Sequence, residues 1–276
     1  MSIKYAYLGP AGTFTEAALL KIAASDDQLI AYANVTAALD AVRKGEANKA
    51  LVPIENSVEG VVARTLDELA SGEPLVITAE TTLPVTFSLM TLENKDPKDI
   101  KSIATHPHAE SQCRSFIAKN YPNAQVIETA STAAAAKGLS KGDYDAAIGA
   151  AIAAKNYQLK IIAEDIGDNT SAVTRFVVVE KPGKSPAATG KDRTSLAVFI
   201  AIDHAGALLE ILNEFAKHQV NLSFIQSRPT GSQLGHYHFI IDAEGHIDDQ
   251  PVAAALAGLK EICEDIRFLG SYPQAK

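Results

Sequence analysis

The sequence of 276 residues has little of several residue types: it has no tryptophan, only two methionines and two cysteines, and 6% aromatic residues. The two cysteines, Cys113 and Cys263, lie far apart and match neither a disulfide framework nor a metal site. No group of histidines and cysteines has the spacing of metal ligands. We therefore expect no bound metal.

Excess positive charge and long apolar runs are also lacking. The chain has 25 Lys+Arg against 33 Asp+Glu, a net charge of −8 at pH 7, whereas a generic polyanion binder needs clustered positive charge. The longest run of apolar residues and glycine, 146–154, is too short to span a membrane. The first residues do not resemble a signal peptide. We expect a cytoplasmic protein with neither a nucleic acid nor a membrane as partner.

Hydrophobic residues make up 47% of the chain and charged residues 21%, which is typical of a folded globule. At roughly 150 residues per domain, the length favours two domains. Apolar strands alternate with helices in the first two thirds, which predicts mainly parallel sheets in two lobes, with a ligand cleft at the carboxyl ends of the strands. The expected strands are 3–8, 28–32, 50–54, 102–105, 125–128, 146–148 and 160–163, and the expected helices are 15–24, 35–44, 109–119 and 132–139.

The composition changes at 181–193, which is rich in proline, glycine and small polar residues and has the character of a linker. The remaining residues predict a βαββαβ order, the ferredoxin-like arrangement. Its expected strands are 195–202, 221–227, 235–242 and 266–270, and its expected helices are 206–217 and 248–263.

A glycine-rich turn at 9–14 lies between a strand and a helix but lacks the G-x-G-x-x-G spacing of a dinucleotide site. Residues 183–185 lack the upstream glycine of a phosphate-binding P-loop. Neither nucleotide motif is present, and we expect no cofactor. The free amides of a helix start, here near Gly12 and Thr13, favour an anion, although a tight turn alone would also explain the glycines.

Three more polar segments follow strands: 55–60 with an acid, an amide and a hydroxyl, 105–108 with two histidines, and 173–178 with Arg175 inside an apolar strand. Helix caps would explain the first two. Because its neighbours are apolar, the Arg175 guanidinium needs an anionic or hydrogen-bonding partner. It suits the binding of an anion in the cleft, and a structural salt bridge is an equally good explanation.

Taken together, these segments resemble the bacterial prephenate dehydratases. The resemblance rests on GPAGTFTEAA at 9–18, VPIENSVEG at 52–60, HPHAESQCR at 106–114 and VTRF at 173–176, while residues 206–209 and 226–229 resemble that family's ACT regulatory domain. It implies an α/β fold with a periplasmic-binding-protein-like, two-lobed catalytic domain at 1–183. Lobe 1 would comprise 1–80 and 165–183, and lobe 2 would comprise 81–164. A linker at 184–193 and a ferredoxin-like ACT domain at 194–276 would follow.

The resemblance also implies an activity: the dehydration and decarboxylation of prephenate to phenylpyruvate in phenylalanine biosynthesis. L-Phenylalanine would act as allosteric effector on a homodimer or homotetramer. The implied catalytic residues are Thr174, Arg175 and Phe176, and the implied substrate-binding residues are Thr13, Asn56, Ser57, Glu59, Gly60 and His106. The implied effector site comprises Gly206, Ala207, Leu208, Leu209, Gln226, Ser227, Arg228 and Pro229.

Three positions depart from the family pattern. Ala172 stands where asparagine is frequent, His108 where glutamine is common, and Gln226 where glutamate is usual, which removes a charge but keeps a hydrogen-bonding group. In the mechanism that the resemblance implies, Arg175 forms a bidentate clamp on a carboxylate of prephenate. Thr174 donates a hydrogen bond to the departing hydroxyl, because an alcohol is too weak an acid for full proton transfer. His106 and Glu59 are lesser candidates for the proton donor.

Three alternatives remain open from the sequence. An arogenate or cyclohexadienyl dehydratase would perform the same chemistry on the amino-acid form of the substrate. A solute-binding protein would share the two lobes and the hinge. A catalytically silent amino-acid sensor would keep only the C-terminal domain's role.

Overall fold

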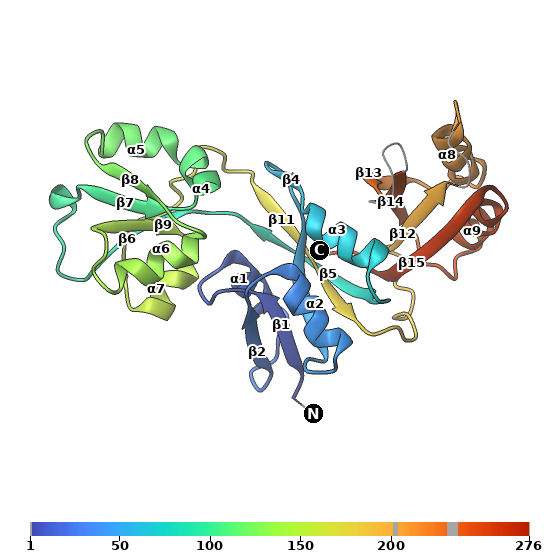
Figure 1. Cartoon of the computed structure of the whole chain (residues 1–276), viewed down its shortest axis with the longest axis horizontal. Helices are drawn as coiled ribbons and strands as arrows, with labels where there is room; N and C mark the ends of the chain where they lie inside the picture. The colour runs from blue at the N-terminus through green and yellow to red at the C-terminus, as the bar shows by residue number, and fades with distance from the viewer. Residues whose placement is uncertain (1, 201–203, 231–236, 276) are drawn as a thin grey trace.

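The computed structural model describes residues 2–200, 204–230 and 237–275. They form three sheets with their helices, arranged in a row with the N-terminal sheet in the middle (Figure 1). Lobe 2, built on the second sheet, lies at one end of the row, and the C-terminal sheet lies at the other. Within the described ranges, no helix combines the length and the apolarity needed to cross a membrane.

Lobe 1 is built on a sheet in the order β2-β1-β3-β11-β5, with β4 paired to β3. Strand β1 runs parallel to β2 and β3, whereas the returning strand β11 is antiparallel to β3 and β5. Strand β3 is buried over Ala50–Ile54, as its continuous apolar run predicts. The strands are β1 (Lys4–Leu8), β2 (Gln28–Tyr32), β3 (Lys49–Asn56), β4 (Gly60–Val61), β5 (Val76–Pro84) and β11 (Val173–Glu180), and the helices are α1 (Phe14–Leu19), α2 (Val35–Arg43) and α3 (Ala63–Ser71).

Lobe 2 has strand order β10-β6-β9-β7-β8, again with parallel and antiparallel pairs. The strand β9 is wholly buried, and the alanine-rich helix α6 packs against it through its small side chains. The strands are β6 (Ser88–Thr91), β7 (Ser102–Thr105), β8 (Gln125–Glu128), β9 (Ala146–Gly149) and β10 (Lys160–Ala163), and the helices are η1 (Pro97–Asp99), α4 (Pro107–Gln112), α5 (Arg114–Asn120), α6 (Thr132–Leu139) and α7 (Ala151–Tyr157).

The C-terminal sheet has strand order β13-β14-β12-β15 and carries two helices, so the expected ferredoxin-like order is confirmed. Residues 201, 202, 235 and 236 of the expected strands lie outside the described residues. The elements are β12 (Asp192–Ile200), α8 (Ala207–Lys217), β13 (Leu222–Pro229), β14 (Tyr237–Glu244), α9 (Gln250–Ile262) and β15 (Cys263–Pro273).

Several local elements differ from the expectation. Helix α1 ends at Leu19 and not at Ala24, because the amides of Lys21 and Ile22 turn back to carbonyls three residues earlier. Strand β5 stays in the first sheet up to Pro84, beyond residue 80 where the first segment of lobe 1 was expected to end. The strands β4, β5 and β6 and the helices η1, α3 and α7 were not anticipated.

Lobe 1 and the C-terminal sheet share one hydrophobic core. A single cluster joins Leu66, Leu69 and Ile77 of lobe 1 to Leu269 and Tyr272 of β15. Gly270, at φ +145°, is needed there because a Cβ atom would overlap the carbonyl oxygen of Ile77. The clusters of lobe 2 are separate from this core, and lobe 2 joins lobe 1 through residues 85–87 and 164–172.

Candidate active site

A cavity of about 820 Å³ lies between the two lobes, where the sequence predicts the cleft. Its wall collects residues that follow the carboxyl ends of β1, β2, β3, β7 and β8, the usual ligand position in open α/β sheets. Of the expected residues, Thr13, Asn56, Glu59, His106, Thr174 and Phe176 line it, whereas Ser57, Gly60 and Arg175 do not.

Thr174 and Asn56 form the central polar pair of this wall. They are register partners on β11 and β3, and the Asn56 amide nitrogen donates to Thr174 Oγ1 at 2.8 Å. The amide orientation is fixed, because Asn56 Oδ1 accepts the backbone N–H groups of Val58 and Glu59 at 2.8 and 2.9 Å. Thr174 Oγ1 therefore accepts from Asn56, and its hydrogen remains available to a ligand.

Ser57 and Gly60 shape the loop that carries Asn56 rather than contacting the cavity. Ser57 exchanges two hydrogen bonds of 2.9 Å with the backbone of Val173, through its own amide and through Oγ. Gly60 adopts φ +83° at the turn that pairs it with Asn56. Ser57 thus holds the start of β11, which carries Thr174, and Gly60 shapes the turn next to Asn56.

Glu59 reaches across the cavity to lobe 2. Gln112 Nε2 donates to Glu59 Oε1 at 3.1 Å, and His108 Nδ1 lies 3.5 Å from Glu59 Oε2. His106 caps helix α4, since its Nδ1 accepts the N–H of His108 at 3.3 Å. Burial, together with the neighbouring His108, lowers the pKa of His106, which favours the neutral ring. His108 thus adds a contact between the lobes.

The start of helix α1 corrects one expectation. Thr13 caps this helix by accepting the N–H of Glu16 at 3.3 Å, and its own hydroxyl donates to the Leu8 carbonyl at 3.2 Å. The carboxylate of Glu16 folds back to accept the amide N–H of Gly12. The Gly12 amide is therefore not open to a substrate anion, because an acidic side chain of the same helix already satisfies it.

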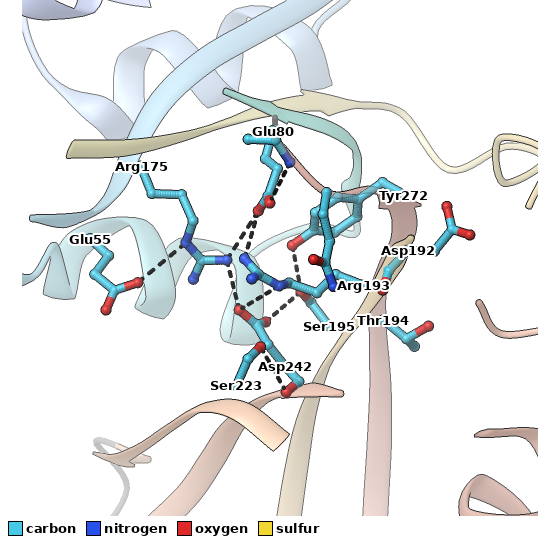
Figure 2. A network of polar contacts seen from close by, with 12 residues as sticks. Glu55, Glu80, Arg175, Asp192, Arg193, Thr194, Ser195, Ser223, Asp242 and Tyr272 are labelled. Carbon is cyan, nitrogen blue, oxygen red and sulfur yellow. Dashed lines mark hydrogen bonds and ion pairs between the residues drawn. The ribbon is translucent and has the colours of Figure 1, made fainter. Parts of the chain in front are cut away.

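Arg175 corrects a second expectation, that of a clamp in the cleft. Successive side chains of a strand point to opposite faces, so Arg175 points away from the cavity that Thr174 and Phe176 line. Its side chain is 9% exposed and lies 2.7 Å from Asp242 and 3.2 Å from Glu80 (Figure 2). The alternative from the sequence, a structural salt bridge, is the one the structure contains.

The rest of the cavity wall is largely apolar. Phe176 is 1% exposed, and the rings of Phe14 and Phe87 meet edge to face at 5.4 Å across the join of the lobes. Sequence reasoning missed Phe14, Phe87 and Ser131 as cavity residues. Only Ser131 carried a local signal, since it caps helix α6 directly after a strand.

The expected effector residues lie on the C-terminal sheet. Gly206, at φ +101°, begins helix α8, and Leu209 is 60% exposed. Strand β13 alternates between half-buried and exposed side chains, with Gln226 and Arg228 on its inner face. Arg228 holds Asp67 of helix α3 with two hydrogen bonds, of 2.9 and 2.7 Å. One expected effector residue is therefore tied to lobe 1 in this structure.

Known proteins match this chain over nearly its whole length. The family model for prephenate dehydratase matches residues 5–184, and the model for the ACT domain matches residues 194–261. The prephenate dehydratase of Amycolatopsis methanolica is 46% identical over 273 residues, covering 99% of this chain and 89% of that protein.

Two solved structures extend the comparison. A prephenate dehydratase from Arthrobacter aurescens in complex with L-Phe is 51% identical, with a TM-score of 0.93 and coverage of 98% of this chain and 90% of that one. GqqA, described as a novel type of quorum-quenching acylase, is 26% identical, with a TM-score of 0.88 and 98% coverage of both chains. With matches to the family model across the cavity-forming residues and to close relatives over nearly its full length, this chain belongs to the prephenate dehydratase family.

Proposed function

We propose that this chain dehydrates and decarboxylates prephenate to phenylpyruvate, in phenylalanine biosynthesis. Membership of the family supports the reaction. The observation that carries the assignment to this cavity is the Asn56–Thr174 pair, which presents an oriented hydroxyl to a mostly apolar space between two lobes.

Prephenate carries two carboxylates and a ring hydroxyl, and loss of the ring carboxylate with the hydroxyl gives an aromatic ring. The electrons of the breaking carbon–carbon bond enter the ring as the carbon–oxygen bond breaks. Thr174 donates a hydrogen bond to the departing oxygen. The Asn56 amide, by donating to Thr174 Oγ1 at 2.8 Å, polarises that hydroxyl and fixes its direction. Such a preorganised donor stabilises charge that develops in the transition state.

The apolar wall favours loss of the carboxylate. A carboxylate held against Phe176 and Phe87 is poorly solvated, so its conversion to neutral carbon dioxide removes an unfavourable burial. The cavity wall contains neither lysine nor arginine among the described residues. Neutral donors such as Ser131 and Thr132, at the amide end of helix α6, are therefore the groups available to the second carboxylate. His106 and Glu59 remain candidates for supplying the proton.

We further infer that L-phenylalanine inhibits the enzyme through the C-terminal sheet. The ACT match and the relative solved with L-Phe support this. The residues proposed for the effector are 206–209 and 226–229. The cytoplasmic location and the homodimer or homotetramer stay predictions.

The assay that tests the proposal follows phenylpyruvate absorbance after prephenate is added to the purified full chain, with and without L-phenylalanine. We expect product formation and inhibition. If no phenylpyruvate forms, the proposed reaction is wrong. If phenylpyruvate forms at the same rate with L-phenylalanine, the proposed inhibition is wrong. Arogenate in the same assay identifies the preferred substrate.

A pair of variants tests the role of Thr174. Thr174→Ser keeps the hydroxyl and should keep most of kcat. Thr174→Val keeps the shape and loses the donor, and kcat should fall by about 10²–10³. Full activity in Thr174→Val would remove the hydroxyl from the mechanism.

A further inference from the structure

Arg175 stands between two cavity residues of β11, yet its guanidinium is buried on the other side of the sheet. Its Nη1 donates to Asp242 Oδ2 at 2.7 Å and to Glu80 Oε2 at 3.2 Å, and its Nε lies 3.3 Å from Glu55 Oε2. Figure 2 shows the guanidinium among these three carboxylates. Burial lowers the pKa of Arg175, but the charges of Asp242 and Glu80 outweigh it and carry the pKa above its ordinary value. The group is a fixed cation.

The partners of Arg175 come from two different parts of the molecule. Glu80 lies on β5 of lobe 1, whereas Asp242 lies on β14 of the C-terminal sheet and is 1% exposed. Asp242 also accepts from Ser195 Oγ at 2.6 Å, and Glu80 accepts from Arg193 Nη1 at 2.7 Å. The cluster is thus a buried ionic contact between the two sheets, and each sheet contributes both a cation and a carboxylate.

The same guanidinium touches the strand that carries the proposed effector residues. Arg175 Cζ lies 5.5 Å from the centre of the Phe224 ring on β13, a cation–π distance. Phe224 is two residues before Gln226, on the same inner face of β13. A displacement of β13 on effector binding would therefore reach Phe224 and, through it, Arg175.

The ladder beside Arg175 is irregular. Its register partner on β3 is Glu55, and the next pair joins Phe176 to Pro53, so Ile54 is left without a partner. Such bulges re-aim side chains and are frequent next to active sites. The neighbouring pair on the other side is Thr174 with Asn56. A shift of the Arg175 backbone would therefore act directly on the polar pair of the cavity.

We propose that Arg175 is a positioning residue that couples the C-terminal sheet to Thr174, through its contacts with Asp242 and Phe224. The inference rests on the proposed function and adds the path by which the effector acts. In this role Arg175 holds β11 against the C-terminal sheet, and it does not bind the substrate carboxylate.

The test compares Asp242→Asn with Glu180→Gln in the full chain. Asp242→Asn keeps the acceptor for Ser195 and removes the charge that faces Arg175. Glu180→Gln is the control, because Glu180 lies on β11, the strand of Arg175, and pairs with Lys49 within lobe 1, 2.7 Å away. We expect Asp242→Asn to bind L-phenylalanine in calorimetry, yet to need at least tenfold more for half-inhibition. Its kcat should fall while KM stays near the wild-type value, and Glu180→Gln should behave as wild type.

Two further variants cover the case in which Asp242→Asn fails to fold. Phe224→Leu keeps an apolar side chain and removes the ring under the guanidinium, and should also weaken inhibition. Arg175→Lys keeps the cation and should keep more of the inhibition than Arg175→Met. Inhibition by L-phenylalanine at wild-type concentrations in Asp242→Asn and Phe224→Leu would overturn the proposal. A rise in KM alone in the Arg175 variants, with intact inhibition, would instead restore the carboxylate clamp.

Hydrogen exchange separates this proposal from the proposed function, because it needs no turnover. L-Phenylalanine should alter amide exchange in the peptide covering 173–180 of the wild type and of Glu180→Gln, but not of Asp242→Asn. A wild-type peptide that does not respond would overturn the coupling even if the prephenate assay succeeds. If the peptide responds to L-phenylalanine but the protein has no dehydratase activity, the coupling is supported and the proposed reaction is wrong.

Discussion

The two contacts that lobe 1 makes with the rest of the chain differ in kind. Toward the C-terminal sheet it shares an apolar core and a buried ionic cluster. Toward lobe 2 it places the ring of Phe14 against the lobe 2 core and otherwise makes hydrogen bonds around the cavity: Tyr157 donates to the Ala11 carbonyl at 2.8 Å, and Asn156 donates to Glu16 at 2.8 Å. Buried apolar surface is costly to expose, whereas polar contacts near solvent exchange readily with water. Opening of the cavity is therefore expected to move lobe 2, with lobe 1 and the C-terminal sheet moving together.

The largest expected effect is at the core shared by lobe 1 and the C-terminal sheet. Gly270→Ala would place a Cβ atom against the backbone of Ile77, at a φ of +145° that other residues rarely adopt. Because neither backbone can yield, we expect the free energy of unfolding to fall by more than about 3 kcal/mol, measured by urea denaturation.

The control is Gly142→Ala in lobe 2. Gly142 also has a positive φ, +83°, but a Cβ atom there meets nothing within 4 Å. Its loss should be limited to the conformational cost of about 1–2 kcal/mol. Equal losses in the two variants would mean that the close approach of β15 to β5 contributes nothing.

Within lobe 2, the next largest effect on stability is expected at the hydrogen bonds of Asp145. Asp145 accepts from Lys95 Nζ at 2.6 Å and from the amides of Lys101 and Ser102. Chiefly the hydrogen bond from Lys95 lowers the pKa of Asp145 to about 2 from 3.8. The ionised form is thus favoured in the folded state. Asp145→Asn should lower the free energy of unfolding by about 2 kcal/mol at pH 7.

The pH dependence of this effect has a definite sign. A carboxylate whose pKa is depressed by folding stabilises the protein above its unfolded pKa, near 3.8, and loses that contribution as pH falls toward about 2. The difference between wild type and Asp145→Asn should therefore shrink over that range in urea denaturation. Asp143→Asn, at an exposed carboxylate two residues away, is the control. A difference that is constant down to pH 2 would contradict the prediction.

Several of the residues expected at the site do line the cavity, and the failure at Arg175 has a non-local cause. Apolar runs and strand–helix alternation identified most of the strands, and the family resemblance named Thr174, Asn56 and His106, which meet at the cavity. The alternation of a strand also separates Arg175 from Thr174, but it does not say which face meets the substrate. That depends on packing between β11 and the C-terminal sheet, which no local pattern encodes.

The other omissions have non-local and local causes. Phe87 reaches the cavity only because the chain crosses between lobes at 85–87. The Gly12 amide is closed by a carboxylate four residues later, a local contact that a capping argument could have included. Helix α3 was missed although its buried positions, Thr65, Leu66, Leu69 and Ala70, have helical spacing.

A smaller effect is expected where the two lobes meet. Tyr157→Phe removes the hydroxyl that donates to Ala11 and leaves the ring in place. We expect a loss of about 0.5–1.5 kcal/mol in the free energy of unfolding, since a single hydrogen bond contributes about that much. Because this bond holds the lobes together, KM for prephenate should rise severalfold. If Tyr157→Phe lowered the free energy of unfolding as much as Gly270→Ala, the contact of lobe 1 with lobe 2 would contribute as much to stability as its contact with the C-terminal sheet.

The smallest expected effect is a pH dependence at His106, on the lobe 2 side of the cavity. Burial, and then the neighbouring His108, lowers its pKa below 6.5 in the folded protein, so the unfolded chain binds a proton more readily. The contribution of neutral His106 is complete above pH 6.5 and declines as pH falls toward the folded pKa. His106→Asn keeps a good helix cap for α4 but cannot titrate. Between pH 8 and pH 5 the wild type should therefore lose more unfolding free energy than this variant. If the unfolding free energies of the wild type and the variant depend on pH in the same way, protonation of His106 costs no more in the folded protein than in the unfolded chain. That result would mean that water reaches the His106 ring in the folded protein, as it reaches the exposed hydrogen bond between Gln112 and Glu59 at the same cavity.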